Sequence, residues 1–149
     1  MSSVIWRGAV ADDVAAVVAL LRDDALGQGR ELGDLARYLA AFEAMEREGA
    51  NHLIVADRGG EILACYQITF ISGLSLNASR RAQIEGVRVA QDLRGQGIGA
   101  LLVEDAQTRA KAAGCSVLQF TSNKSRSDAH RFYQRLGFTP SHIGYKKSL

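Results

Sequence analysis

In residues 87–99 the chain reads Val87-Arg88-Val89-Ala90-Gln91-Asp92-Leu93-Arg94-Gly95-Gln96-Gly97-Ile98-Gly99. A strand-like run leads through a turn and a glycine-rich loop into the apolar stripe of a helix. Glycines at alternate positions let the backbone approach a ligand closely, because no side chains stand in the way. A helix N-terminus offers unpaired N–H groups and a positive dipole end, which favour an anion. The stretch therefore predicts a phosphate or pyrophosphate site.

Three phosphate-binding patterns can be compared with this loop. The Rossmann fingerprint needs G-x-G-x-x-G, whereas this loop reads G-x-G-x-G. The Walker loop needs a lysine followed by Ser or Thr after its last glycine, and here Ala100 and Leu101 follow. The pattern R-x-x-G-x-G/A matches Arg94–Gly99 throughout. The alternative is that the glycines only make a tight turn from strand to helix.

The elements around this stretch follow from hydrophobic period and turn residues. Helices are expected to begin at the capping residues Asp12, Asp34 and Asp128, and another follows Gly95. Strands are expected at residues 4–8, 52–57, 61–71, 83–89, 116–121 and 143–148. Residues 72–81 form a long polar loop, which is often a functional feature. The order β-α-α-β-β-β-α-β-α-β predicts an α/β (α+β) fold with a mixed sheet, in a single domain of residues 1–149.

Composition excludes several classes of protein. The formal net charge is +2, so no strong field recruits nucleic acid or a membrane. Cys65 and Cys115 form neither a CxxC pair nor a metal ladder, which indicates two reduced core thiols. The start of the chain lacks the pattern of a signal peptide, and no apolar run reaches membrane-spanning length. We therefore expect a cytoplasmic protein.

A second segment supports the reading of the glycine loop. It reads Asp128-Ala129-His130-Arg131-Phe132-Tyr133-Gln134-Arg135-Leu136-Gly137-Phe138. With the R-x-x-G-x-G loop before it, this A-x-x-F-Y core and closing L-G-F resemble the GCN5-related N-acetyltransferase (GNAT) superfamily. The resemblance is strong over residues 82–140 and rests on element order before them. The tail 121–149 looks closest to aminoalkylphosphonate N-acetyltransferases, and the resemblance implies the acyl-CoA N-acyltransferase fold.

The resemblance also implies two catalytic residues. Tyr133 matches the family's general acid, which protonates the departing CoA sulfur. Its place on the apolar helix stripe would by itself favour a core tyrosine, whereas the motif favours the acid. Glu85 falls where several members place the base that takes the amine proton. By strand alternation Glu85 should share a face with Val87 and Val89 and be partly desolvated. The alternative is a structural carboxylate that pairs with Arg88 or a loop cation.

Acetyl-CoA is the implied cosubstrate. Its pantetheine arm would run along the main chain of Val87, Arg88 and Val89. The pyrophosphate would be held by Arg94, Gly95, Gln96, Gly97, Ile98, Gly99 and Ala100. Many members carry an asparagine seven residues before the tyrosine, where this chain has Arg126. Asn123 could substitute in contacting the pantetheine, and Arg126 could meet the 3′-phosphate or an acidic substrate. A solvated basic loop is the plainer alternative.

The function predicted is transfer of an acetyl group from acetyl-CoA to a primary amine of a small molecule, by direct attack in a ternary complex. The alternatives are a protein or peptide amine acetyltransferase and a non-catalytic acyl-CoA-binding sensor domain. Arg80 and Arg81 would suit an acidic substrate. His52, His130 and His142 match no metal template, so no metal is expected. A homodimer could form through the aromatic-rich strand 66–71.

Overall fold

The computed structural model describes residues 3–24 and 26–149. The chain divides into two compact units, residues 1–119 and 120–149, and each is described by itself. The first unit carries the sheet with its covering helices, and the second carries one helix and the C-terminal tail. The single domain expected for residues 1–149 stays a prediction.

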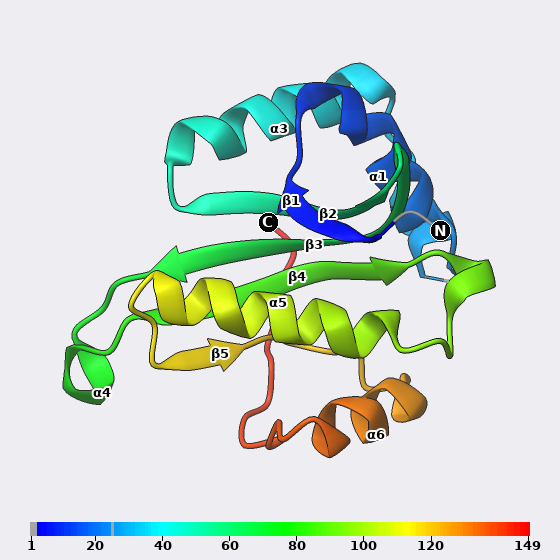
Figure 1. Cartoon of the computed structure of the whole chain (residues 1–149). Helices are drawn as coiled ribbons and strands as arrows, with labels where there is room; N and C mark the ends of the chain where they lie inside the picture. Colours follow the sequence, from blue (N-terminus) through cyan, green and yellow to red (C-terminus); the bar gives the residue numbers. More distant parts are fainter. Residues whose placement is uncertain (1–2, 25) are drawn as a thin grey trace. The chain divides into compact units, whose positions relative to one another are not determined.

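The sheet is mixed, as the sequence predicts (Figure 1). Its spatial order is β1-β2-β3-β4-β5, with antiparallel pairing except between β4 and β5, which run parallel. A turn containing Gly60, with φ +96°, joins β2 to β3. The strands are β1 (Ile5–Gly8), β2 (Asn51–Arg58), β3 (Glu61–Ile71), β4 (Arg81–Val89) and β5 (Val117–Gln119).

One predicted helix start has its expected capping residue, and the helix expected after Gly95 begins three residues later. Asp34 accepts a hydrogen bond from the Arg37 N–H and caps α3, and Gly97, with φ +86°, precedes α5. Short helices that the sequence did not indicate occur between these elements. The helices are η1 (Ala11–Asp13), α1 (Val14–Arg22), α2 (Gly27–Arg30), α3 (Leu35–Glu48), α4 (Ser75–Ala78), η2 (Gln91–Leu93), α5 (Ile98–Ala112) and α6 (Ser127–Arg135).

Helices cover both faces of the sheet in the first unit (Figure 1). Cys65 packs with Val17 and Leu20 of α1, whereas the hydroxyl of its neighbour Tyr66 donates to Asp105 of α5. Successive strand residues point to opposite faces, so α1 and α5 lie on opposite sides. Phe42 of α3 packs with α1, which places α3 on the α1 side.

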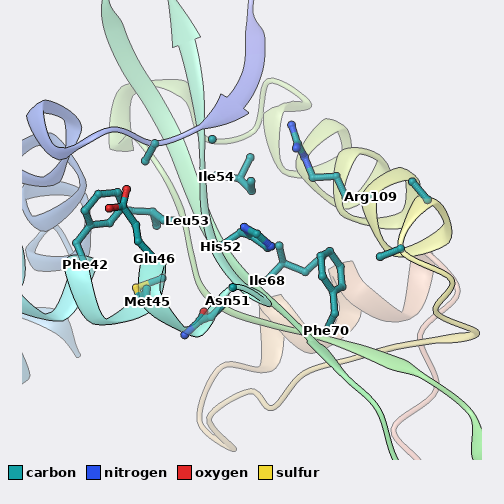
Figure 2. Close-up of a pocket in the computed structure, with 15 residues that line it drawn as sticks. Phe42, Met45, Glu46, Asn51, His52, Leu53, Ile54, Ile68, Phe70 and Arg109 are labelled. Carbon is teal, nitrogen blue, oxygen red and sulfur yellow. The ribbon is translucent and has the colours of Figure 1, made fainter.

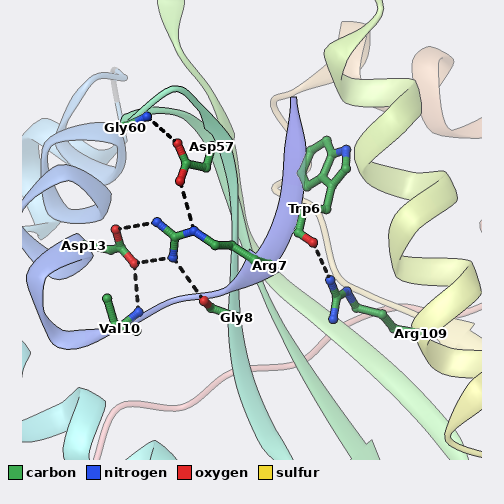
Figure 3. Close-up of polar contacts among 8 residues, drawn as sticks. All are labelled: Trp6, Arg7, Gly8, Val10, Asp13, Asp57, Gly60 and Arg109. Atoms are coloured by element: carbon green, nitrogen blue, oxygen red, sulfur yellow. Dashed lines mark hydrogen bonds and ion pairs between the residues drawn. The ribbon is translucent and has the colours of Figure 1, made fainter. Parts of the chain in front are cut away.

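A partly buried ion-pair network ties the first strand to η1 and β2, and it shows that the helix starts later than expected (Figure 3). Arg7 donates to both carboxylate oxygens of Asp13 at 2.7 and 3.0 Å and to Asp57 at 3.0 Å. Asp13 also accepts the Val10 N–H at 2.8 Å. The α-helix therefore begins after a 3₁₀ turn that ends at Asp13, and Asp12 lies inside that turn and not at the helix start. The Arg7 guanidinium holds the pKa of Asp13 below its ordinary value.

The end of the chain differs from the sequence prediction. The strand expected at residues 143–148 is not formed, and Ile143 and Tyr145 are exposed. A strand needs a partner for its N–H and C=O groups, and the local sequence does not supply one. Helix α6 begins after Arg126 without a side-chain cap, so Asp128 lies inside the first turn, where it pairs with Arg131. Gly137, with φ +95°, follows the helix as expected.

The predicted loop before β4 contains the single turn α4. Leu76, Asn77 and Ala78 have φ of 54°, 61° and 57°, so the backbone is locally left-handed. Leu74 and Leu76 are exposed at this tip. Among the described residues, no helix is long and apolar enough to cross a membrane.

Candidate active site

Strand β4 loses one of its neighbours halfway along. It pairs with β3 as far as Val89, but it pairs with β5 only through Arg81, Ala82 and Gln83. In the described chain, the β5-facing edge of residues 84–89 thus has no strand on it. Such an edge presents main-chain donors and acceptors that an extended ligand can pair with.

A bulge lies where this free edge begins. Cys65 pairs with Arg88 and Gln67 with Glu85, so Gly86 and Val87 together stand opposite Tyr66. Gly86 has φ +59°, a conformation that glycine adopts without strain. Its carbonyl accepts a contact of 3.6 Å from the Cys65 thiol. The extra residue bends β4 and reverses its alternation.

This reversal corrects the expected environment of Glu85. Register partners share a face, so Glu85, opposite Gln67, lies on the α1 side together with Arg88, opposite Cys65. Val87 and Val89 alternate with Arg88 and lie on the other face, contrary to the prediction. Glu85 is also exposed, so the partial desolvation expected for it is not observed. The sequence could not show the bulge, because a glycine inside a strand is only a weak sign of one.

The glycine turn connects β4 to α5. Gly95 and Gly97 have φ of +79° and +86°, and a Cβ built at either would meet nothing within 4 Å. The turn therefore needs glycine for its backbone conformation, and the space above it is open. The Leu101 N–H donates to Gly97 O, so the N–H groups of Ile98, Gly99 and Ala100 lie in the first turn of α5. First-turn N–H groups have no partner within their own helix.

The Arg94 side chain has partners within the protein. Its Nε donates to the Val89 carbonyl at 3.2 Å, and an Nη donates to the Asp23 carbonyl at 3.1 Å. The backbone N–H of Arg94 donates to the Gln91 carbonyl at 3.4 Å. Arg94 thus ties the end of α1 to the end of β4, and the groups best placed for an anion are the backbone N–H groups that follow it.

The remaining predicted residues belong to the second unit. Tyr133 of α6 packs against Phe120, Phe132 and Phe138, with ring centroids 4.3, 5.2 and 5.8 Å away. The Asn123 side-chain oxygen accepts from the N–H and the hydroxyl of Ser125. Its carbonyl accepts from the Arg126 N–H. Asn123 therefore shapes its own loop. Arg126, the residue before α6, is exposed.

A separate hollow opens at the other edge of the sheet. It has a volume of about 680 Å³ and lies between α3 and α5, beside the start of β2 (Figure 2). Phe42, Met45, His52, Phe70 and Arg109 line it. None of the site residues predicted from the sequence lies in its lining. The described residues contain no group of three or more His, Cys, Asp or Glu that could hold a metal ion.

A strand with a bulge and one free edge runs into a glycine turn and a helix N-terminus, so an extended ligand with an anionic group would meet main-chain donors along its whole length. The chain belongs to the acetyltransferase (GNAT) family, whose sequence model matches residues 15–138. The predicted superfamily and fold class are confirmed.

Two similar proteins are named acetyltransferases, and one similar structure carries a different description. The aminoalkylphosphonate N-acetyltransferase of Salmonella typhimurium is 34% identical over 98 residues, 66% of this chain and 63% of that protein. This chain thus spans less than two thirds of that relative. The L-methionine sulfoximine/L-methionine sulfone acetyltransferase of Pseudomonas paraeruginosa is 29% identical over 143 residues, 93% of this chain and 81% of that protein. A crystal structure described as a transcriptional regulator from Bacillus halodurans C-125 is 43% identical, with a TM-score of 0.94 and coverage of 99% of this chain and 100% of that one.

Proposed function

We propose that this protein transfers an acetyl group from acetyl-CoA to the primary amine of a small molecule. The observation that carries the proposal is the continuous path from the free edge of β4 to the first turn of α5. A pantetheine arm carries amide groups that can pair with an exposed strand edge. A pyrophosphate fits a glycine turn at a helix N-terminus. Along this path the strand edge comes before the helix N-terminus, which is the order in which the pantetheine arm and the pyrophosphate follow each other in CoA.

The reaction would proceed within one ternary complex. The amine nitrogen attacks the thioester carbonyl carbon, the C–S bond breaks, and the acetyl group stays on nitrogen. Glu85, which is exposed on β4, would take the amine proton directly or through water. Tyr133 would give a proton to the departing thiolate, and a β4 amide would stabilise the charge on the carbonyl oxygen.

The chemistry of Cys65 supports direct attack over a covalent acetyl-enzyme. Burial raises the pKa of the Cys65 thiol to about 12. Since the thiolate is the nucleophilic form, this buried thiol is a poor acetyl acceptor at neutral pH. Cys115, the other cysteine, is also a free thiol, and it lies at the turn between α5 and β5.

The names of the relatives favour one class of amine. One relative is named for aminoalkylphosphonates and the other for methionine sulfoximine and methionine sulfone, and all three are small amines that carry an acidic group. We therefore propose a small acid-bearing amine as the acceptor. The non-catalytic sensor domain remains the second candidate, because the 43% identical neighbour is described as a transcriptional regulator.

Calorimetry on the purified protein tests the cofactor. CoA and acetyl-CoA should bind with a measurable heat, whereas ATP and NAD should not, because the loop lacks the Walker lysine and the Rossmann spacing. A response to ATP or NAD with none to saturating CoA would refute the proposal.

A further inference from the structure

Asp24 joins the α1–α2 turn to β4. One of its carboxylate oxygens accepts the Gly27 N–H, and the other lies 2.8 Å from Nε of Arg88. The two side chains are only 23% and 11% exposed, so the charges are largely shielded from water. Gly27 has no room for a Cβ, which would clash with the Leu21 carbonyl. The turn is therefore held closely against the end of α1, with the Asp24 carboxylate directed at β4.

The Arg88 guanidinium is incompletely used. Its Nε lies at ion-pair distance from an Asp24 carboxylate oxygen. The Nε–H group nevertheless makes no hydrogen bond with any residue in the described part of the chain. One Nη donates to the neighbouring Val87 carbonyl at 2.9 Å. A guanidinium carries five N–H donors in a planar fork that suits a carboxylate or a phosphonate. A single Asp24 oxygen thus faces one edge of the fork, and it makes no hydrogen bond with Nε.

Arg88 also lies close to the residue proposed as the base. The bulge puts it on the same face of the sheet as Glu85, the proposed base. Three strand residues span roughly 10 Å, less the bend of the bulge. Arginine and glutamate side chains extending from such positions can hold the acid and the amine of one small molecule between them. Without the bulge, Arg88 and Glu85 would face opposite sides.

We propose that Arg88 is the specificity residue of the acceptor site, where it binds the acidic group of the amine substrate in place of Asp24. The inference rests on the proposed acetyltransferase function. Asp24 keeps the buried guanidinium neutralised while the site is empty. The substrate's carboxylate or phosphonate then takes over, and its amine is directed toward Glu85. A small neutral amine would have to leave the Asp24–Arg88 pair intact and would lack this anchor.

The test compares matched amines on variants of the full chain. L-methionine sulfone is paired with its carboxamide, and 2-aminoethylphosphonate with its diethyl ester. The readout is the ratio of kcat/KM for the acid to kcat/KM for its neutral partner. In Arg88→Gln this ratio should fall about 30-fold, mostly through KM, as expected for losing a charge-assisted hydrogen bond. Arg88→Lys should restore part of it, and Asp24→Asn should raise it. Arg58→Gln, which removes an exposed cation paired with Glu61, should leave it unchanged.

The outcomes separate this inference from the proposed function. If Arg88→Gln and Asp24→Asn lowered the acid and its neutral partner in equal proportion, Arg88 would only anchor the turn and the inference would be wrong. If no amine were acetylated, the proposed function would fail. In that case, calorimetric titration of the two acids into the CoA-saturated protein would still test whether Arg88 binds the acidic group. Heat with wild type and none with Arg88→Gln supports the inference, and equal behaviour overturns it.

Discussion

Tyr133 lies among aromatic rings of its own unit, and these contacts involve its ring. Replacing Tyr133 by Phe keeps the ring and removes the hydroxyl. We expect kcat to fall by about 10²-fold, the scale of losing a general acid, with the CoA dissociation constant nearly unchanged. Steady-state kinetics and calorimetry measure the two quantities. Tyr145→Phe, in the exposed tail, is the matched control. Full activity of Tyr133→Phe would remove the acid assignment.

Glu85 can be tested in the same way. Glu85→Gln keeps the size and polarity of the side chain but cannot accept the amine proton. We expect kcat to fall by about 10²-fold on the best amine. Glu61→Gln removes an exposed carboxylate at the start of β3 and should be active. If both variants kept their turnover, another group or bulk water would be the base.

At this scale the sequence predicts residue types better than residue surroundings. The motif singled out Glu85 and Arg88, yet the alternation rule put Glu85 beside the wrong neighbours, because one inserted residue at Gly86–Val87 reverses the pattern. Asp24 was not singled out at all. Its partner lies 64 positions away in the chain, and nothing in the local sequence signals a pair formed across two elements.

The glycine turn, as an element, has a matched control elsewhere in the fold. Gly97→Asp adds a side chain and a negative charge at the proposed pyrophosphate site. Gly60→Asp makes the same change in the β2–β3 turn, where φ is also positive and the Cβ position is also open. Each should cost about 1 kcal/mol through backbone strain. Only Gly97→Asp should abolish CoA binding in calorimetry, and equal affinity in both variants would contradict the site.

The Arg7–Asp13–Asp57 network stabilises the junction of β1, η1 and β2 (Figure 3). Asp13→Asn should lower the free energy of unfolding by ~2 kcal/mol at neutral pH, the scale of hydrogen bonds to a charged group. Because the folded pKa of Asp13 is depressed, its contribution is complete above the ordinary pKa of aspartate, about 4. The contribution is lost as the pH falls through the depressed value.

Thermal unfolding of wild type and Asp13→Asn between neutral pH and pH ~2 measures this dependence. The difference between their free energies of unfolding should be largest at neutral pH and should vanish at the acid end of the range. Asp12→Asn, at the exposed neighbouring position, is the control. A gap that stayed constant with pH would contradict the role of the Asp13 charge.

The elements themselves were largely predictable. The β2–β3 hairpin, α3, β4 and α5 follow the hydrophobic period and their flanking glycine and aspartate residues. The strand expected at residues 143–148 is not formed for a physical reason, since the local sequence does not provide the neighbouring strand that would pair with it. The short helices α2 and α4 span four residues each and leave too little pattern to detect.

At the scale of the whole molecule, family membership and a mixed sheet agree with the sequence prediction. Residues of the proposed cofactor path lie in the first unit and Tyr133 lies in the second, so activity would require both. The expected homodimer and the cytoplasmic location stay predictions.

Transfer of acetyl from acetyl-CoA to an acid-bearing amine tests the central claim most directly. The purified chain is incubated with saturating acetyl-CoA and a panel of amines that includes aminoalkylphosphonates, amino acids, polyamines and peptides. Free thiol is followed together with the mass of each amine. The account predicts equal amounts of free CoA and N-acetylated product, with acid-bearing amines the best acceptors. Tight CoA binding with no acetylated amine in the panel would contradict it and favour a sensor domain.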